Sequence, residues 1–162
     1  MSRVPFEKNP LDPRRANNFL DSCAFDPKYA PEHEAAQKIR CIANKGGISV
    51  LLAHSNQKEI DHANTPEDVK CEARAMVYTI ETSLTLGEQA QKAEIHRILT
   101  GNGTPEKYAA DSAHIFEAGK YIGYFITADR RILEKRDELR RACAATVVTP
   151  SEWLHIYHDA DT

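Results

Sequence analysis

The chain lacks the cysteine pairs, leader segment and long hydrophobic runs that mark several protein classes. None of its four cysteines belongs to a C-x-x-C pair, which argues against a zinc ribbon or a thioredoxin-type motif. The start of the chain contains no apolar leader segment, and no hydrophobic run approaches the length of a membrane span. We therefore expect small, buried, reduced cysteines in a cytoplasmic protein with no membrane partner.

Positive charge is not in excess either. The formal net charge is −3, which argues against a protein that coats nucleic acid by bulk electrostatics, although a local basic rim around an acidic site stays compatible with it. The length of 162 residues, the hydrophobic fraction of 41% and the absence of repeats or internal linkers indicate one domain with a core. We expect an extended, proline-rich arm over residues 1–15 and the domain over residues 16–158.

The hydrophobic pattern predicts short strands that alternate with helices. The strands are expected at residues 17–20, 48–52, 77–80, 124–127 and 146–148. Helices are expected over residues 35–43 and 130–141 and after the cap signals at Thr65, Thr85 and Thr149. A further helix carries Asp111 and begins either at Thr104-Pro105 or at Asp111 itself. This alternation predicts an α/β fold, a three-layer α/β/α sandwich with a central parallel sheet of about five strands.

Four acidic residues lie at the ends of these predicted elements, namely Asp21, Glu59, Asp111 and Asp129. Taken singly, each is explained more simply as a cap, a turn residue or, for Glu59, a solvated helix residue. Together they fit a cleft at the carboxyl edge of a parallel sheet, where open α/β folds bind their ligands. Carboxylates that converge there repel one another, and a divalent cation such as Mg²⁺ or Mn²⁺ resolves the repulsion.

Four sequence phrases resemble those of the PIN-domain family, which includes RNA-processing nucleases and the toxins of many bacterial toxin–antitoxin pairs. The phrases are FLDSCAF, HSNQKEI, DSAHIFEAGKYIGYFITADRRIL and VVTPSEWL, and the resemblance spans about residues 16–155. The four acids match the family's acidic positions in order, and Thr127 matches its small hydroxyl residue two places before the last acid. The chain departs from the family at His114 and Phe116, where more aliphatic residues are usual.

The resemblance implies a PIN-like fold and a Mg²⁺- or Mn²⁺-dependent endoribonuclease. Asp21, Glu59 and Asp111 would ligate one or two ions, and Asp129 would complete the shell directly or through water, so that all four acids are catalytic. The metal would polarise a phosphate of the RNA and supply a hydroxide for in-line attack, which leaves a 5′-phosphate and a 3′-hydroxyl. No nucleophilic side chain is needed for this chemistry.

The same resemblance implies the substrate contacts and the partners. Thr127 and Arg130 are the residues expected at the RNA substrate. The other basic residues of segment 130–141 alternate with acidic ones and indicate a salt-bridged surface. A toxin would also bind an antitoxin protein, whereas an RNA-processing role is a second context, and small domains of this family often form homodimers.

Other roles stay open on the sequence alone. A phosphohydrolase needs an Asp-x-Asp pair after the first strand, and Cys23 stands at its second position. A catalytically silent PIN-like domain that binds protein or RNA fits the negative net charge, but not the presence of all four acids. His114 is either a donor to Asp111, whose helix face it shares, or a core histidine. His155 and His158 fit a polar chain end better than a zinc site.

Overall fold

The computed structural model describes residues 11–21, 32–52, 77–78 and 83–160, together with the single residue Glu67. The elements in these residues are β1 (Asn17–Leu20), α1 (Glu32–Asn44), β2 (Ser49–Leu52), β3 (Val77–Tyr78), α4 (Leu86–Thr100), the 3₁₀ turn η4 (Pro105–Tyr108), α5 (Ala109–Lys120), β4 (Tyr124–Ile126), α6 (Arg130–Glu134), α7 (Arg136–Ala142), β5 (Thr146–Val148) and α8 (Pro150–Asp159). Glu59 and the cap signal at Thr65 lie outside the described residues.

The five strands of the described residues form one parallel sheet in the order β3-β2-β1-β4-β5. β1 lies at its centre, with Asn18 paired with Val50 of β2 on one side and with Tyr124 of β4 on the other. The strand order reverses between β1 and β4, because β2 and β3 extend the sheet on one side of β1 and β4 and β5 extend it on the other. The predicted α/β class and the parallel sheet are confirmed.

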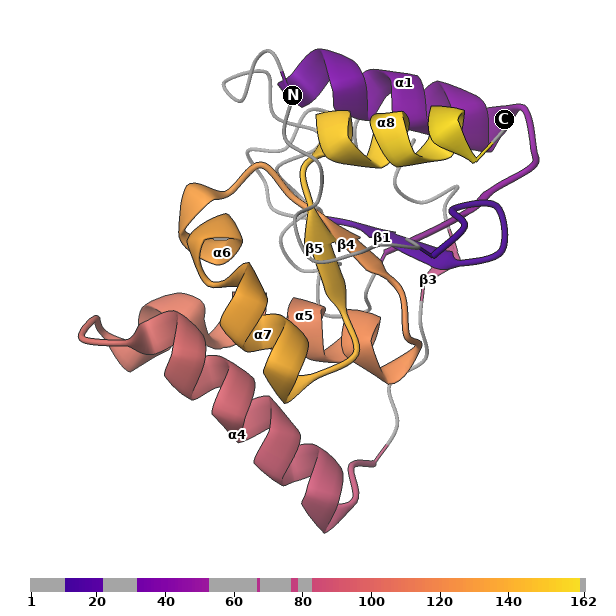
Figure 1. Ribbon diagram of the computed structural model, residues 1–162. Helices are drawn as coiled ribbons and strands as arrows, with labels where there is room; N and C mark the ends of the chain where they lie inside the picture. Colours follow the sequence, from indigo (N-terminus) through magenta and orange to yellow (C-terminus); the bar gives the residue numbers. More distant parts are fainter. Residues whose placement is uncertain (1–10, 22–31, 53–66, 68–76, 79–82, 161–162) are drawn as a thin grey trace.

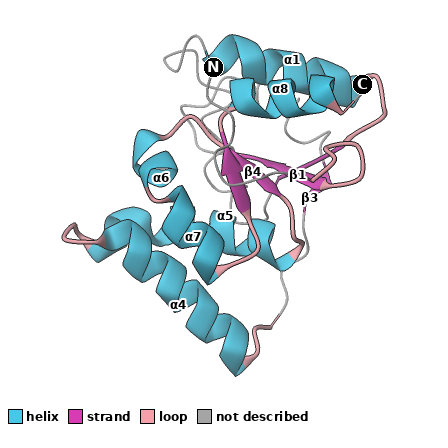
Figure 2. Ribbon diagram, in the orientation of Figure 1, coloured by secondary structure: helices cyan, strands magenta, loops and turns pink. Residues whose placement is uncertain are grey.

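Helices cover both faces of the sheet. In Figure 1, α1 and α8 lie side by side on one face, and α4, α5 and α7 lie on the other. Figure 2 shows the same arrangement with the strands between the two helical layers. Alternate strand residues supply the two cores, because side chains point to opposite faces with a period of two. Leu20 and Ile126 pack with α1 and α8, whereas Phe19 and Phe125 pack with α4, α5 and α7.

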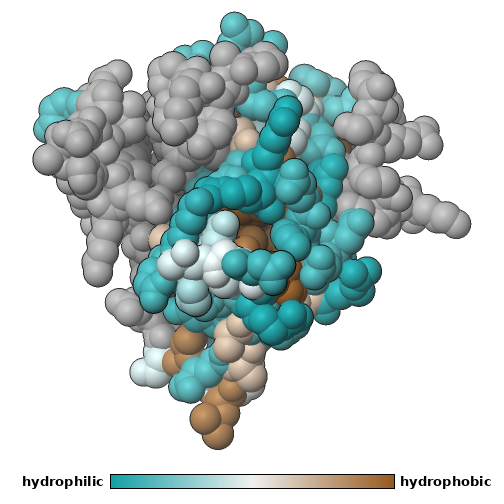
Figure 3. All heavy atoms as spheres, turned by 90° about the vertical axis from the view of Figure 1, so that its left-hand side faces the viewer, coloured by the Kyte–Doolittle hydropathy of each residue, from teal (hydrophilic) through white to brown (hydrophobic). Residues whose placement is uncertain are grey.

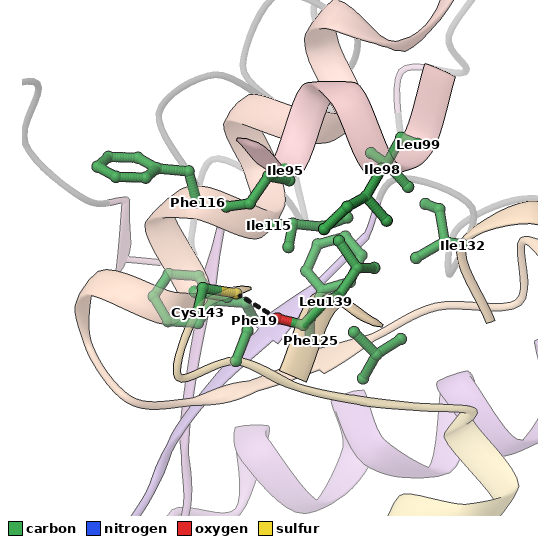
Figure 4. Packing of buried hydrophobic residues seen from close by; sticks show 13 residues of the cluster. Phe19, Ile95, Ile98, Leu99, Ile115, Phe116, Phe125, Ile132, Leu139 and Cys143 are labelled. Carbon is green, nitrogen blue, oxygen red and sulfur yellow. Dashed lines mark hydrogen bonds between the residues drawn. The ribbon is translucent and has the colours of Figure 1, made fainter. Parts of the chain in front are cut away.

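Figure 4 shows the hydrophobic cluster under α4 and α5, which includes one thiol. Ile95 of α4 and Ile115 of α5 are completely buried there. Cys143 is also buried, donates from Sγ to the backbone carbonyl of Leu139 at 3.2 Å, and has a thiol pKa that burial raises. Cys143 and Cys41 are both free, as expected, but the expectation of burial is confirmed only for Cys143 and is wrong for Cys41, which is exposed on α1.

Local capping signals account for the starts of α4 and α8. Thr85 and Glu88 form a reciprocal capping box, with the Glu88 N–H donating to Thr85 Oγ1 at 3.1 Å and the Thr85 N–H donating to Glu88 Oε1 at 3.0 Å. Thr149 and Glu152 repeat this arrangement at the start of α8. These two predicted helix starts are confirmed.

The helix that carries Asp111 begins at neither predicted position. Thr104 and Pro105 open the 3₁₀ turn η4, and the chain then continues directly into α5, whose N-cap is Tyr108. Asp111 therefore lies inside the first turn of α5, where its charge complements the helix dipole. It is not the cap of this helix.

The helix predicted over residues 130–141 is two helices. Lys135 interrupts it with φ −101° and ψ 5°, so that α6 ends before Lys135 and α7 starts after it. The second helix begins with Arg136, whose Nη1 donates to both carboxylate oxygens of Glu152 in α8, at 2.9 and 3.1 Å. The sequence pattern contains no proline or glycine here and could not show this break.

The surface view is mainly hydrophilic. In Figure 3, hydrophobic side chains gather toward the lower end of the face, where α4 begins in Figure 1. Leu86, the first residue of α4, is 84% exposed. Among the helices of the described residues, none combines the length and the apolar character needed to cross a membrane.

Candidate metal centre

Asp21, Asp111 and His114 come together where the end of β1 meets the start of α5. One ligand atom from each side chain, a carboxylate oxygen or a ring nitrogen, lies within 4.8 Å of the other two. Asp21 and His114 are buried and Asp111 is half-buried. Across the part of the chain that the structure describes, this is the one group of three such side chains.

Two periodicities bring these residues together. Phe19 of β1 packs in the core beneath α5, so Asp21, two residues further along, belongs to the same face of the sheet. The Asp21 N–H donates to the carbonyl of Ile126 at 3.0 Å, which holds this residue against β4 beyond the end of β1. Asp111 and His114 are three residues apart on α5 and therefore share one side of the helix.

The position in the sheet is the one that α/β folds use for ligands. Asp21 and Thr127 directly follow β1 and β4, the two neighbouring strands between which the strand order reverses. A crevice forms outside the carboxyl ends of the strands at such a reversal, because the connections from the two strands leave toward opposite sides. The site thus lies where the topology favours a bound group.

Thr127 orients the carboxylate of Asp21. Its side chain is 0% exposed, and its hydroxyl donates to Asp21 Oδ2 at 2.8 Å. The same hydroxyl oxygen accepts from the N–H of Asp129 at 3.0 Å. A hydroxyl has one proton to donate, so this second bond leaves the proton directed at Asp21. Oδ2 is thereby held by Thr127, and Oδ1 is the oxygen that faces His114.

His114 is the part of the site that packing does not explain. It is 0% exposed, and within the described residues neither ring nitrogen has a hydrogen-bond partner. Its Nδ1 lies 3.9 Å from Oδ1 of Asp21, which is too long for a hydrogen bond. Leaving a buried polar group unsatisfied costs about 1–3 kcal/mol. A group that bound to this nitrogen would remove that cost.

A divalent cation fits this donor set. Metal–ligand bonds of about 2.1 Å place adjacent ligand atoms of one octahedral or tetrahedral ion about 3.0 to 3.4 Å apart. His114 Nδ1 and Asp21 Oδ1, which are 3.9 Å apart, would therefore move slightly closer when they bind one ion. The two carboxylates supply the charge that such an ion requires, and the ion removes their mutual repulsion. The buried cluster can therefore hold a metal ion.

Asp129 lies near this cluster but is engaged elsewhere. It is the N-cap of α6, and its Oδ1 accepts from the N–H of Arg131 at 2.9 Å. Its Oδ2 accepts from Nη2 of Arg131 at 3.2 Å, and this hydrogen bond and the negative charge raise the pKa of the guanidinium. Arg131 also lies over the ring of Tyr108, 5.3 Å from its centroid. Asp129 is not among the three residues whose ligand atoms converge.

The structure thus brings together two of the four predicted acids, Asp21 and Asp111. Glu59 lies outside the described residues, and Asp129 is joined to the site through Thr127 rather than through its carboxylate. Of the two predicted substrate contacts, Thr127 is buried, whereas Arg130 is exposed.

The third member of the cluster, His114, was not among the predicted ligands. Its spacing of three residues from Asp111 was the available signal, because that spacing places both side chains on one helix face. At the other end of the chain, His155 lies 3.1 Å from Asp159, one helical turn away. The described residues hold no three-residue ligand cluster there.

No protein-family profile, curated protein or solved structure matches the chain. The site consists of a buried Asp–Asp–His cluster at the strand-order reversal of a parallel α/β sheet.

Proposed function

We propose that this protein is a PIN-like, metal-dependent ribonuclease whose ion is held by Asp21, Asp111 and His114. The observation that carries the proposal is the buried imidazole without a hydrogen-bond partner beside two carboxylates. The sequence phrases that resemble PIN domains support it, because Asp21 follows β1 and Asp111 lies in the first turn of α5. The proposal retains Glu59 as a further ligand on the strength of the resemblance.

The chain's own residues would bind and orient the reactants. A divalent ion, Mg²⁺ or Mn²⁺ by the resemblance, supplies Lewis-acid activation of an RNA phosphodiester and of the attacking water. Asp21 and Asp111 balance the charge of that ion, and Thr127 keeps the Asp21 carboxylate in one orientation. Arg130 is exposed one residue beyond Asp129, where a guanidinium can pair with a phosphate oxygen.

The RNA substrate and the protein partners rest on the resemblance. A toxin would be inhibited by an antitoxin protein, and a homodimer is a further expectation. A neighbouring gene for a short DNA-binding antitoxin would support the toxin context, and its absence would support an RNA-processing role. Both contexts use the same site and give the same products, a 5′-phosphate and a 3′-hydroxyl.

The experiment that tests the proposal combines cleavage and metal binding. Wild type, Asp21→Asn and Asp137→Asn are incubated with single-stranded and structured RNA in Mn²⁺, Mg²⁺ or EDTA, and the melting temperature of each is measured with and without Mn²⁺. Asp137 is an exposed carboxylate in the first turn of α7 and serves as the matched control. We expect cleavage by wild type and Asp137→Asn, inhibition by EDTA, and loss of both cleavage and the Mn²⁺-dependent shift in Asp21→Asn.

The alternative outcomes are distinct. Cleavage that survives in Asp21→Asn would point to another active site or to a contaminating nuclease. A wild type that binds Mn²⁺ but cleaves no RNA would contradict the nuclease and favour a catalytically silent domain that binds protein or RNA. A wild type that shows no Mn²⁺-dependent shift would remove the basis of the proposal.

A further inference from the structure

The composition of the cluster bears on which ion it takes. Asp129 is the fourth predicted acid. Its Oδ1 accepts a hydrogen bond from the backbone N–H of Arg131, and its Oδ2 accepts one from the Arg131 guanidinium. Its charge is therefore balanced by Arg131 rather than by an ion in the cluster. Among the described residues, the converging donors are two carboxylates and one imidazole.

The imidazole is placed as a ligand and not as a structural group. Two buried polar side chains near His114, those of Ser112 and Thr127, are hydrogen bonded within the protein. Ser112, on the same helix as His114, donates to the carbonyl of Tyr108 at 2.7 Å, and the Thr127 hydroxyl donates to Asp21. His114 is as deeply buried as Thr127 and has Nδ1 directed toward Asp21, yet the described residues offer its ring nitrogens no hydrogen bond. A bound ion would supply the missing partner.

Donor chemistry then discriminates between ions. Mg²⁺ prefers oxygen ligands and keeps several of its waters, whereas imidazole suits first-row transition ions such as Fe²⁺, Co²⁺ and Zn²⁺. We infer that the site takes one such transition ion in preference to Mg²⁺, and that His114 sets this preference. The preference rests on the proposed metal-dependent function and extends it to the identity of the ion. The two carboxylates balance the charge of one divalent ion, and the imidazole adds a donor without adding negative charge.

Calorimetric titration with Co²⁺ and with Mg²⁺ tests the preference without relying on activity. The titrations use full-length protein carrying His155→Ala and His158→Ala, because those histidines lie one turn apart on α8 and His158 is exposed, so they can bind Co²⁺ independently. In this background we compare the unsubstituted site with His114→Asn and Asp111→Asn. The first substitution exchanges an imidazole for an amide oxygen, and the second removes the charge of an oxygen ligand.

We expect His114→Asn to weaken Co²⁺ binding at least about tenfold, since even losing a partner of a metal ligand weakens binding 10- to 100-fold. Mg²⁺ binding should change less than about twofold, because the amide still offers oxygen. Asp111→Asn should weaken both ions by similar factors. Equal effects of His114→Asn on both ions, or no effect on either, would overturn the assignment of His114.

A second measurement needs no substitution at His114. The proton NMR spectrum of the Co²⁺-loaded background protein should contain hyperfine-shifted imidazole ring signals, and their absence would overturn the inference even if His114→Asn failed to fold. The proposed function is tested separately by RNA cleavage. Absence of binding by either ion would overturn the inference and the function together. The expected dependence on His114 without RNA cleavage would support the inference and overturn only the nuclease.

Discussion

Asn18 and His114 are both fully buried polar side chains, but they lie on opposite faces of the sheet and differ in their partners. The amide nitrogen of Asn18 donates to the carbonyls of Pro13, Ala16 and Ser49, at 2.9, 3.2 and 3.0 Å. Its amide oxygen accepts from the indole N–H of Trp153 at 2.9 Å. Within the described residues, the ring nitrogens of His114 have no such partner.

The difference separates a structural polar group from a ligand. Asn18 ties β1 to the start of β2 and to α8, and its hydrogen bonds offset the cost of burying the amide. His114 bears the cost of burial without this compensation, beside two carboxylates that repel each other. Burial of a polar residue therefore does not indicate function by itself, whereas burial without a partner next to other ligand atoms does.

Replacing Asn18 should have the largest effect on stability. Asn18→Leu leaves the indole N–H and three carbonyls without their partner, and we expect the free energy of unfolding to fall by about 3 kcal/mol. Urea denaturation measures the change. Asn44→Leu, at the exposed end of α1, is the matched control and should change stability by less than about 0.5 kcal/mol. Equal effects at the two positions would show that the Asn18 hydrogen bonds are not a structural tie.

Thr127 shares a property with each of these residues. Its hydroxyl is hydrogen bonded, like the Asn18 amide, but one of those hydrogen bonds orients Asp21, a proposed metal ligand. Thr127→Val keeps the shape and removes the hydrogen bonds to Asp21 and Asp129, so stability should fall by about 1–2 kcal/mol. Mn²⁺ binding should also weaken, because the Asp21 carboxylate loses its fixed orientation. Thr127→Ser retains the hydroxyl and should restore both properties in the same denaturation and calorimetric assays. If Thr127→Ser behaved like Thr127→Val, the hydroxyl would not be the source of the stability or of the Mn²⁺ affinity.

His114→Leu should act in the opposite direction when no metal is present. The substitution removes an unsatisfied buried imidazole, and we expect the free energy of unfolding in EDTA to rise by about 1 kcal/mol. In Mn²⁺ the order should invert, since wild type alone gains the full stabilisation from the bound ion. His158→Leu, on the exposed end of α8, should leave the value in EDTA unchanged. A loss of more than about 2 kcal/mol in EDTA would place His114 in the same structural class as Asn18.

Glu88 is a polar residue outside the core, and replacing it should have the smallest effect on stability. The N–H of Thr85 lowers the pKa of the Glu88 carboxyl below 4.5, because it hydrogen-bonds the charged form. A carboxyl with a lowered folded-state pKa stabilises the protein above pH 4.5, and this contribution is lost as the pH falls through the folded-state pKa. Glu88→Gln should therefore show a slightly smaller fall in melting temperature than wild type between about pH 6 and about pH 3. Glu134→Gln, an exposed glutamate, should follow the wild-type curve.

Short-range patterns in the sequence were reliable where the contacts that they describe are themselves short-range. The capping boxes at Thr85 and Thr149 were predicted and confirmed, because neighbouring residues make their contacts. The strand at Asn17–Leu20 was also predicted and confirmed, although its pairing with β2 and β4 is long-range. The start of α5 was predicted wrongly, because the 3₁₀ turn η4 runs directly into that helix. The break at Lys135 was missed, since the partner of Arg136 is Glu152 in another helix.

The sequence by itself determined the period of each element and the place of Asp21 after β1, because these depend on residues close along the chain. Only the tertiary structure decided which ligand atoms share a site. The burial of His114 beside Asp21 depends on how α5 packs against the sheet. The link from Asp129 to Asp21 runs through Thr127, at the end of a neighbouring strand. Such through-space distances are set by the packing of the whole core, which no local pattern contains.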